Sequence, residues 1–181
     1  MCKRVGYGKV YRSLFVIGKE TETLDDEGEI IATSDVIPTQ EQIMATLPQM
    51  VGDKEIEIPK FSAVHIEGKR AYDLARKGID FTPPKKVITI NRFEMLTLDD
   101  CRHDLESIGE KYIEQPNSFY FEIECQTGTY VRSLAKLLAQ KLGTLAIASV
   151  IIRTKVGEFD LMNAKGLEEV TIDDLISFNE I

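Results

Sequence analysis

The 181-residue sequence has few of the residue types on which several common kinds of site depend. Its three cysteines, Cys2, Cys101 and Cys125, lie far apart and form neither a zinc-ligand pattern nor a disulfide framework. Its two histidines, His65 and His103, do not stand beside a nucleophile motif, so serine–histidine catalysis fits poorly and both are interpreted as structural. We therefore predict a reducing, cytoplasmic setting.

Long apolar runs and glycine-rich phosphate loops are also missing. No stretch approaches the ~20 apolar residues that a membrane helix needs, and no signal peptide follows Met1, so we expect no membrane association. The lack of a Gly-rich loop argues against a nucleotide cofactor. The acidic loop around Asp25 does not match a calcium loop, because Gly28 is misplaced for an EF-hand and no bidentate Glu follows. The sequence thus predicts neither a metal nor a cofactor.

The formal net charge is −8, but basic residues are concentrated in three blocks. Residues 1–20 carry five basic residues and one acidic residue, residues 59–86 carry seven and three, and residues 125–157 carry five and none. Acidic blocks lie between and after them, at residues 21–58, 94–124 and 158–181. If the fold gathers the basic blocks on one face, that face would attract phosphate groups. The alternative is a surface charge that is merely uneven.

The apolar content of 43% suits a globular core, and hydrophobic periodicity predicts its elements. We expect an α+β protein with a mixed, largely antiparallel sheet flanked by helices. The expected strands are 9–17, 29–33, 59–66, 87–98, 119–125 and 145–156, the last one buried. The expected helices are one opened by a capping box at Thr39 and Gln42, then 69–77, 131–142, a turn near Leu105 and Ile108, and one from Thr171.

The stretch Thr127–Leu134 joins an alternating strand to an apolar helix and is predicted to form a sharp corner. Gly128 permits the turn, and Thr129 is expected to cap the helix. Tyr130 and Arg132 then leave the first helical turn, where free amides and the helix dipole favour an anion. The Tyr130 ring could contact a base, and the Arg132 guanidinium could bind a carboxylate or a phosphate. The alternative is an ordinary capped helix with a surface arginine.

Two further groups of residues could bind RNA. Lys9 and Tyr11 alternate along a strand and so share a face, where one offers a positive charge and the other a ring for stacking. The alternative is an exposed alternating strand. A second group surrounds Tyr72 and would form a patch for an RNA backbone, with a solvated helix face as the alternative: Lys69, Arg70, Arg76 and Lys77.

Five blocks, in order along the chain, resemble motifs of the TruB family of tRNA pseudouridine synthases. Two of them depart from the family pattern at one position each, with Glu22 where the family usually has Asp and Ile152 where it has Arg. The blocks are Lys9-Val10-Tyr11 for K-x-Y, residues 21–28 for T-D-T-x-D-x-x-G, residues 59–78 for the block P-x-x-S-A-x-x-x-x-G-x-x-x-Y-x-x-A-R-x-G, residues 128–134 for G-T-Y-[IV]-R-[ST]-[LI], and residues 151–159 for L-R-R-T-x-x-G-x-F.

The resemblance implies isomerisation of the T-loop uridine at position 55 of tRNA, without metal or organic cofactor. In the family an aspartate opens the glycosidic bond of a flipped uridine, and the base turns and is reattached through carbon. By the matched motifs Tyr11 would stack on the base, Arg132 would pair with the catalytic aspartate, and Tyr130 would shape the pocket. The matched motifs also imply pocket contacts at Asp25 and Ile151. They imply RNA contacts at Lys9, Lys69, Arg70, Arg76, Lys77 and Arg153.

The family's nucleophile lies in a G-x-L-D-P-x-A-x-G motif upstream of K-x-Y, and this sequence has no such motif before Lys9. Asp25 and Asp26 belong to a different block and are not interpreted as the nucleophile. We expect residues 1–157 to form part of a pseudouridine synthase catalytic domain. Residues 158–181 are expected to form a tail with a short helix rather than a complete RNA-binding PUA domain.

A chain of this kind is expected to be inactive alone, unless a preceding segment or a second chain supplies the aspartate that Arg132 would hold. The expected partner is the T-arm of tRNA. An alternative from another class is a non-catalytic RNA-binding module derived from such an enzyme. A further alternative is a soluble α+β domain that binds no RNA.

Overall fold

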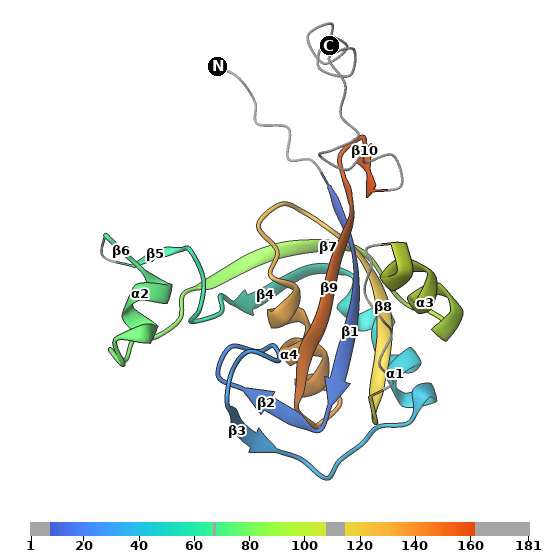
Figure 1. Ribbon diagram of the computed structural model, residues 1–181, viewed down its shortest axis with the longest axis horizontal. Coiled ribbons are helices and arrows are strands. Elements are labelled where there is room, and N and C mark those ends of the chain that lie inside the picture. Colours follow the sequence, from blue (N-terminus) through green and yellow to red (C-terminus); the bar gives the residue numbers. More distant parts are fainter. Residues whose placement is uncertain (1–7, 67, 108–114, 162–181) are drawn as a thin grey trace, which may run out of the picture.

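The computed structural model describes residues 8–66, 68–107 and 115–161 (Figure 1). Its centre is a six-stranded sheet in the order β10-β9-β1-β8-β7-β4, and each pair of neighbours is antiparallel. The strands are β1 (Lys9–Ile17), β4 (Gly52–Glu57), β7 (Lys85–Met95), β8 (Ser118–Cys125), β9 (Ala146–Val156) and β10 (Phe159–Asp160). Two small antiparallel pairs stand apart from it, β2 (Lys19–Thr21) with β3 (Ile30–Thr33) and β5 (His65–Ile66) with β6 (Lys69–Arg70).

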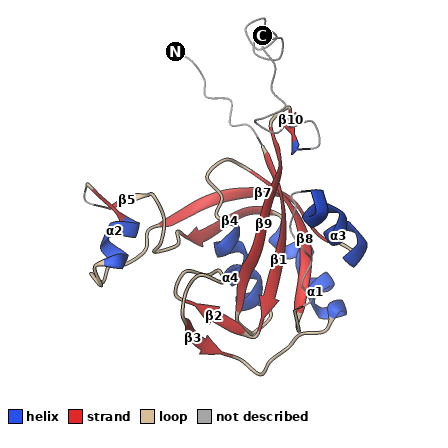
Figure 2. Cartoon of the chain, viewed as in Figure 1, coloured by secondary structure: helices blue, strands red, loops and turns tan. Residues whose placement is uncertain are grey.

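One face of the sheet carries the main hydrophobic core. Helix α4 (Val131–Lys141), helix α1 (Gln40–Thr46) and the following 3-10 turn η1 (Leu47–Met50) pack there (Figures 1 and 2). The rings of Phe15, Phe93 and Phe121 meet at the centre, with centroids 4.9–6.2 Å apart. The alternation of strand residues explains this arrangement, because β1 and β8 send every second side chain to this face.

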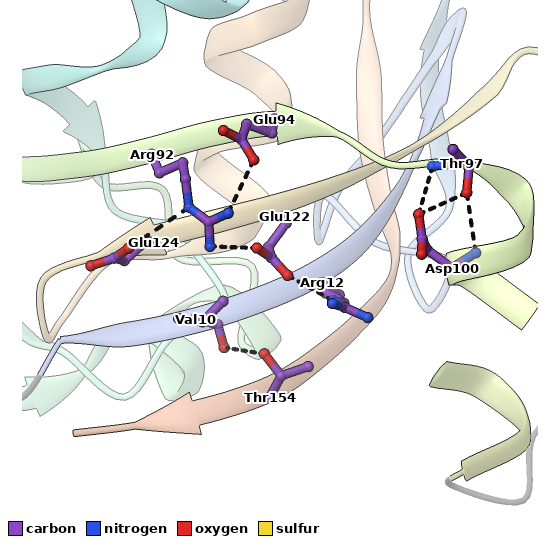
Figure 3. A network of polar contacts seen from close by, with 9 residues as sticks. All are labelled: Val10, Arg12, Arg92, Glu94, Thr97, Asp100, Glu122, Glu124 and Thr154. Carbon is purple, nitrogen blue, oxygen red and sulfur yellow. Dashed lines mark hydrogen bonds and ion pairs between the residues drawn. The ribbon is translucent and has the colours of Figure 1, made fainter. Parts of the chain in front are cut away.

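The opposite face is more polar. Leu14 and Tyr120 form a small apolar cluster there, and an ion-pair network lies beside it (Figure 3). Glu122, with its side chain 11% exposed, accepts from Arg12 at 2.8 Å and pairs with Arg92, which also donates to Glu94 at 3.0 Å. These charges come from β1, β7 and β8, so the network joins three adjacent strands across their outer face.

Helix α3 (Leu98–Ser107) and helix α2 (Ala71–Arg76) complete the described elements, and α2 projects to one side with β5 and β6 (Figure 1). The predicted α+β class with a largely antiparallel sheet is confirmed. The capping box is also confirmed, since Thr39 accepts from the Gln42 amide and the Gln42 side chain accepts from the Thr39 amide. The expected helix at Thr171, and most of the tail 158–181, lie outside the described residues, as does Ile108.

Several expected elements are wrong. Residues 59–66 were expected to form one strand, but only His65 and Ile66 do, because the chain bends after Pro59. Strand β4 was missed because its polar sequence GDKEIE buries only Ile56. In strand β9 only Ala146, Ile147, Ala148 and Ile152 are buried, and the pairing with β1 is irregular, so it is not a uniformly buried strand.

Candidate active site

The corner between β8 and α4 forms at the position that the sequence predicts, but with a different cap. Gly128 has a φ of 85°, which a residue with a side chain rarely adopts. The N-cap is Tyr130 rather than Thr129, and no side chain caps the helix. The Thr129 hydroxyl donates to the Gln126 carbonyl at 2.8 Å and is thereby used within the turn. Arg132 follows in the first turn of α4.

Arg132 is bound to the loop between β2 and β3. Its Nη1 donates to the Asp25 carboxylate and to the Thr23 carbonyl, at 2.9 and 2.8 Å, and its Nη2 donates to the Phe61 carbonyl at 2.9 Å. The side chains of Arg132 and Asp25 are 20% and 21% exposed. Within this chain Asp25 is therefore the ion-pair partner of Arg132, and the predicted pairing of Arg132 with a catalytic aspartate stays a prediction.

Hydrogen bonds within the loop at residues 21–28 stabilise its conformation. The Thr21 hydroxyl donates to the Asp25 carbonyl at 2.6 Å, and the Asp25 carboxylate accepts from the Thr23 hydroxyl and from the Glu27 amide. A Cβ at Gly28 would lie 2.4 Å from Thr23 Oγ1 and 2.7 Å from its backbone nitrogen. The glycine of this motif is therefore required by space, and the loop presents the Asp25 carboxylate to Arg132.

Tyr11 lies on the same face of the sheet as α4 and belongs to the main core, with 7% of its surface exposed. The Arg153 guanidinium lies 5.5 Å from the centre of its ring. The Tyr130 side chain packs against the same core. Ile151 is 42% exposed and pairs with Ser13, two residues along β1 from Tyr11. Strand alternation therefore puts Tyr11, Arg153 and Ile151 on one face, and Lys9 shares it.

The predicted basic patch forms a small unit of β5, β6 and α2. The side chains of Lys69, Arg70, Arg76 and Lys77 are all exposed. The Arg76 guanidinium lies 4.3 Å from the centre of the Tyr72 ring, and that ring meets Phe61 edge-on at 6.5 Å. The other three line a shallow cavity with His65. Because the Phe61 carbonyl accepts from Arg132, this unit is joined through Phe61 to the Asp25–Arg132 pair.

One cavity lies beside this pair rather than at it. It has a volume of about 540 Å³, and Thr21, Leu24 and Ser133, which flank the pair in sequence, belong to its wall. Four carboxylates and three amines also line it: Glu20, Glu22, Glu55 and Glu57, with Lys60, Lys85 and Lys136. This excess of carboxylates does not suit a phosphate backbone.

Sequence reasoning missed three contributions to the site. The carbonyls of Thr23 and Phe61 bind Arg132, and Lys86 Nζ donates to the Gly128 carbonyl at 3.3 Å. Because Thr23 lies in a matched motif, the sequence could identify the loop. It could not identify the contact between the Thr23 carbonyl and Arg132. Backbone carbonyls have no signal in the sequence, and Lys86 is one of many surface lysines.

Burial raises the pKa of the Cys125 thiol, which lies at the end of β8 beneath the corner. Among the described residues, no three His, Cys, Asp or Glu side chains are grouped so that they could hold a metal ion. None of the helices described here is both long and apolar enough to cross a membrane.

A sequence profile described as TruB family pseudouridylate synthase (N terminal domain) matches residues 3–131. The chain belongs to the TruB family. The family predicted from the five ordered motifs is thus confirmed, while the roles of the individual site residues stay predictions.

Two TruB relatives show how much of a family member this chain spans. It is 38% identical to the tRNA pseudouridine synthase B of Caulobacter vibrioides over 169 residues, which are 92% of this chain and 48% of that protein. It is 36% identical to the enzyme of the same name from Borreliella burgdorferi, over 96% of this chain and 56% of that protein. The chain therefore spans about half the length of these curated relatives.

A solved structure supports the fold. A chain in the crystal structure of a Cbf5-Nop10-Gar1 complex matches with a TM-score of 0.52 at 20% identity, over 97% of this chain and 37% of that chain. This likeness extends over nearly all of the TruB chain and concerns its fold alone.

Proposed function

We propose that this chain contributes the pocket and RNA-binding surface of a TruB-type tRNA pseudouridine synthase, which converts the T-loop uridine at position 55 to pseudouridine. The observation that carries the proposal is the position of Arg132. It lies on the first turn of α4, bound to the loop of a matched motif, on the sheet face that also holds Tyr11. Residues from three of the matched motifs thus supply one region of the molecule.

The guanidinium of Arg132 retains capacity for a second carboxylate. It has five N–H donors, and the contacts to Thr23, Asp25 and Phe61 use three of them. Within the described ranges, Nε–H and one Nη2–H have no acceptor. An aspartate from a preceding segment or a second chain could accept from these donors, which would hold it ionised and oriented for attack.

In the proposed reaction that aspartate opens the glycosidic bond, and the freed base turns so that its C5 forms the new bond. The hydrogen on C5 leaves as a proton when the product forms. Tyr11 would stack on the flipped base, with Tyr130 and Ile151 around it and Asp25 keeping Arg132 in place. The phosphates of the T-arm would meet Lys9, Arg153 and the exposed residues of the β5–β6–α2 unit.

The test joins to this chain the part of the Caulobacter vibrioides relative that precedes the matched region. The fusion is incubated with tRNA that carries tritium at uridine C5, and release of tritium measures the isomerisation. We expect release with the fusion and none with Arg132→Met in the same fusion. A Lys54→Ala fusion, changed on the acidic β4 strand, is the matched control and should keep its activity.

A non-catalytic RNA-binding module is the second candidate, and the exposed basic side chains of the β5–β6–α2 unit are the observation that supports it. It predicts salt-sensitive tRNA binding by every fusion, with no tritium release from any of them. Absent or salt-independent tRNA binding would contradict both candidates.

A further inference from the structure

Strand β9 carries two β-bulges where it pairs with β1. Val10 lies opposite Lys155 and Tyr11 opposite Arg153, so Thr154 is an extra residue on β9. Leu14 lies opposite Val150 and Phe15 opposite Ala148, so Ser149 is a second extra residue. A bulge of this kind commonly re-aims side chains next to a functional site.

The bulges determine which face the segment between them presents. Ala148 lies in the main core opposite Phe15, so it fixes the facing of the first half of β9. If β9 continued from Ala148 as a regular ladder, Ile151 would lie opposite Arg12 and face the reverse side. The Ser149 bulge instead places Ile151 opposite Ser13 and brings it to the Tyr11 face.

The Ser149 bulge also changes the face of the sheet on which Arg153 lies. In a regular ladder it would lie opposite Val10, on the face that carries the ion-pair network (Figure 3). With the bulge it lies opposite Tyr11, and its guanidinium covers the Tyr11 ring at 5.5 Å. The wall of the proposed uridine pocket therefore depends on Ser149 being accommodated as a bulge rather than paired in the ladder.

Both extra residues carry a hydroxyl, and each hydroxyl is bound to a neighbouring element. Ser149 Oγ donates to the carboxylate of Asp26, which is adjacent to Asp25 in the loop that binds Arg132. Thr154 Oγ1 donates to the carbonyl of Val10, which precedes Tyr11 (Figure 3). One bulge is thus tied to the loop and the other to the strand that holds the predicted stacking residue.

Backbone contacts hold the same segment. The Ala148 amide donates to the Leu24 carbonyl at 3.1 Å, and the Ser13 hydroxyl donates to the Val150 carbonyl at 2.5 Å. Leu24 itself has a φ of 64°, a conformation that costs energy for a residue with a side chain. The loop is therefore held in an uncommon shape where it meets the first bulge.

We propose that Ser149 and Thr154 are positioning residues of the uridine pocket, because their hydroxyls hold the two bulges between which Ile151 and Arg153 face Tyr11. The description of this region as a uridine pocket rests on the proposed function. The positioning itself does not, because it concerns contacts within the chain.

The test compares two double variants that differ in their hydroxyl groups. Ser149→Val with Thr154→Val removes both hydroxyls, whereas Ser149→Thr with Thr154→Ser keeps them. The readout is the Nε–H proton of Arg153 in NMR spectra of the full chain, assigned by its loss in Arg153→Lys. The ring of Tyr11 should shift this resonance, and Tyr11→Leu should abolish the shift.

We expect the valine pair to lose most of the ring-induced shift and the hydroxyl-keeping pair to retain it. The Arg76 resonance is an internal reference, since Arg76 lies 4.3 Å from the Tyr72 ring in a separate unit and should not change. One result would overturn the inference. It is a valine pair whose Arg76 resonance is unchanged and whose Arg153 resonance keeps its full ring-induced shift.

Deletion of Ser149 is a second test, because a purely stabilising role for this residue predicts the opposite result. Without this residue a regular ladder already places Ile151 opposite Ser13 and Arg153 opposite Tyr11, so the Arg153 shift should survive the deletion. If Ser149 acted only as a stabilising residue, deletion would disturb the strand more than the valine substitution. Loss of the shift in the deletion variant alone would therefore contradict the inference.

A binding measurement separates this inference from the proposed function. A T-arm RNA hairpin should bind the valine pair about tenfold more weakly than the hydroxyl-keeping pair, which corresponds to ~1.4 kcal/mol. Equal RNA binding with a lost Arg153 shift would uphold the positioning role and contradict the pocket assignment. An unchanged Arg153 shift would overturn the positioning role whatever the RNA does.

Discussion

The loop at residues 21–28 and the β5–β6–α2 unit both match family motifs, yet their polar side chains lie in different environments. In the loop, the polar side chains of Thr21, Thr23 and Asp25 bond inward. In the unit, the charged side chains point to solvent, and Arg76 lies on the Tyr72 ring. The loop is built for a fixed geometry, whereas the unit is suited to an electrostatic surface that can adapt to an RNA backbone.

The largest expected effect comes from filling the space at Gly28. Gly28→Ala places a Cβ 2.4 Å from Thr23 Oγ1, so the loop has to move away from Arg132. We expect the free energy of unfolding to fall by about 2–3 kcal/mol, as for other overpacked sites. Urea unfolding measures this change. The matched control is Gly8→Ala, where nothing lies within 4 Å of the added carbon, and an equal loss there would contradict the explanation.

The next effect compares the ion pair of the loop with an exposed ion pair beside the β5–β6–α2 unit. Asp25→Asn weakens the contact with Arg132 at a site where both side chains are about four-fifths buried. We expect a loss of about 2 kcal/mol, the usual size for hydrogen bonds to charged groups. Asp80→Asn removes the pair with Lys60 where Asp80 is 93% exposed, and should cost almost nothing. Thermal unfolding of both variants measures the contrast, and similar losses would show that the loop is not the more rigid region.

The basic unit should show the opposite behaviour, with little effect on stability and a clear effect on RNA affinity. Single alanine variants of Lys69, Arg70 and Lys77 should each weaken T-arm binding a few-fold and lower the salt slope by about one. Binding titrations at several salt concentrations measure both quantities. Lys54→Ala, in the acidic block, is the control, and a salt slope that no variant changes would remove the unit from the RNA interface.

The smallest expected effect concerns pH and the corner beneath α4. Burial raises the pKa of the Cys125 thiol in the folded protein. The neutral thiol is then favoured by folding, so its contribution is complete below the unfolded pKa of ~8.5 and is lost as pH rises through the folded value. The stability of the native chain should fall slightly relative to Cys125→Ala between pH 8 and 10. Parallel pH curves for the two proteins would show that burial does not suppress ionisation there.

Local signals in the sequence predicted much of the fold. The capping box at Thr39 and Gln42 and the strand 9–17 depend on neighbouring residues, and both formed as expected. The polar strand Gly52–Glu57 has only one buried residue and therefore no hydrophobic alternation to find. Thr129 looked like a cap, but its hydroxyl was taken by the nearby Gln126 carbonyl.

The candidate site was less predictable because its contacts span long stretches of chain. The motifs identified Asp25 and Arg132, but the bond between them joins positions 107 residues apart. The sequence also shows no sign of the β9 bulges, since residues 145–156 read as an apolar run rich in Ile and Val. Which face Ile151 presents depends on the pairing with β1, and no property of residues 145–156 alone determines that pairing.

The position of β1 in the sheet also has a consequence for the order of folding. Lys9 pairs with Cys125 on one side and with Val156 on the other. The central strand is thus made first during synthesis, while both of its neighbours are made more than a hundred residues later. Pairings across such separations are slow to form, because a long loop has to close before any contact is gained. Tyr11 therefore lies in an unpaired strand until β8 has been made, and the predicted pocket can assemble only after β9 follows.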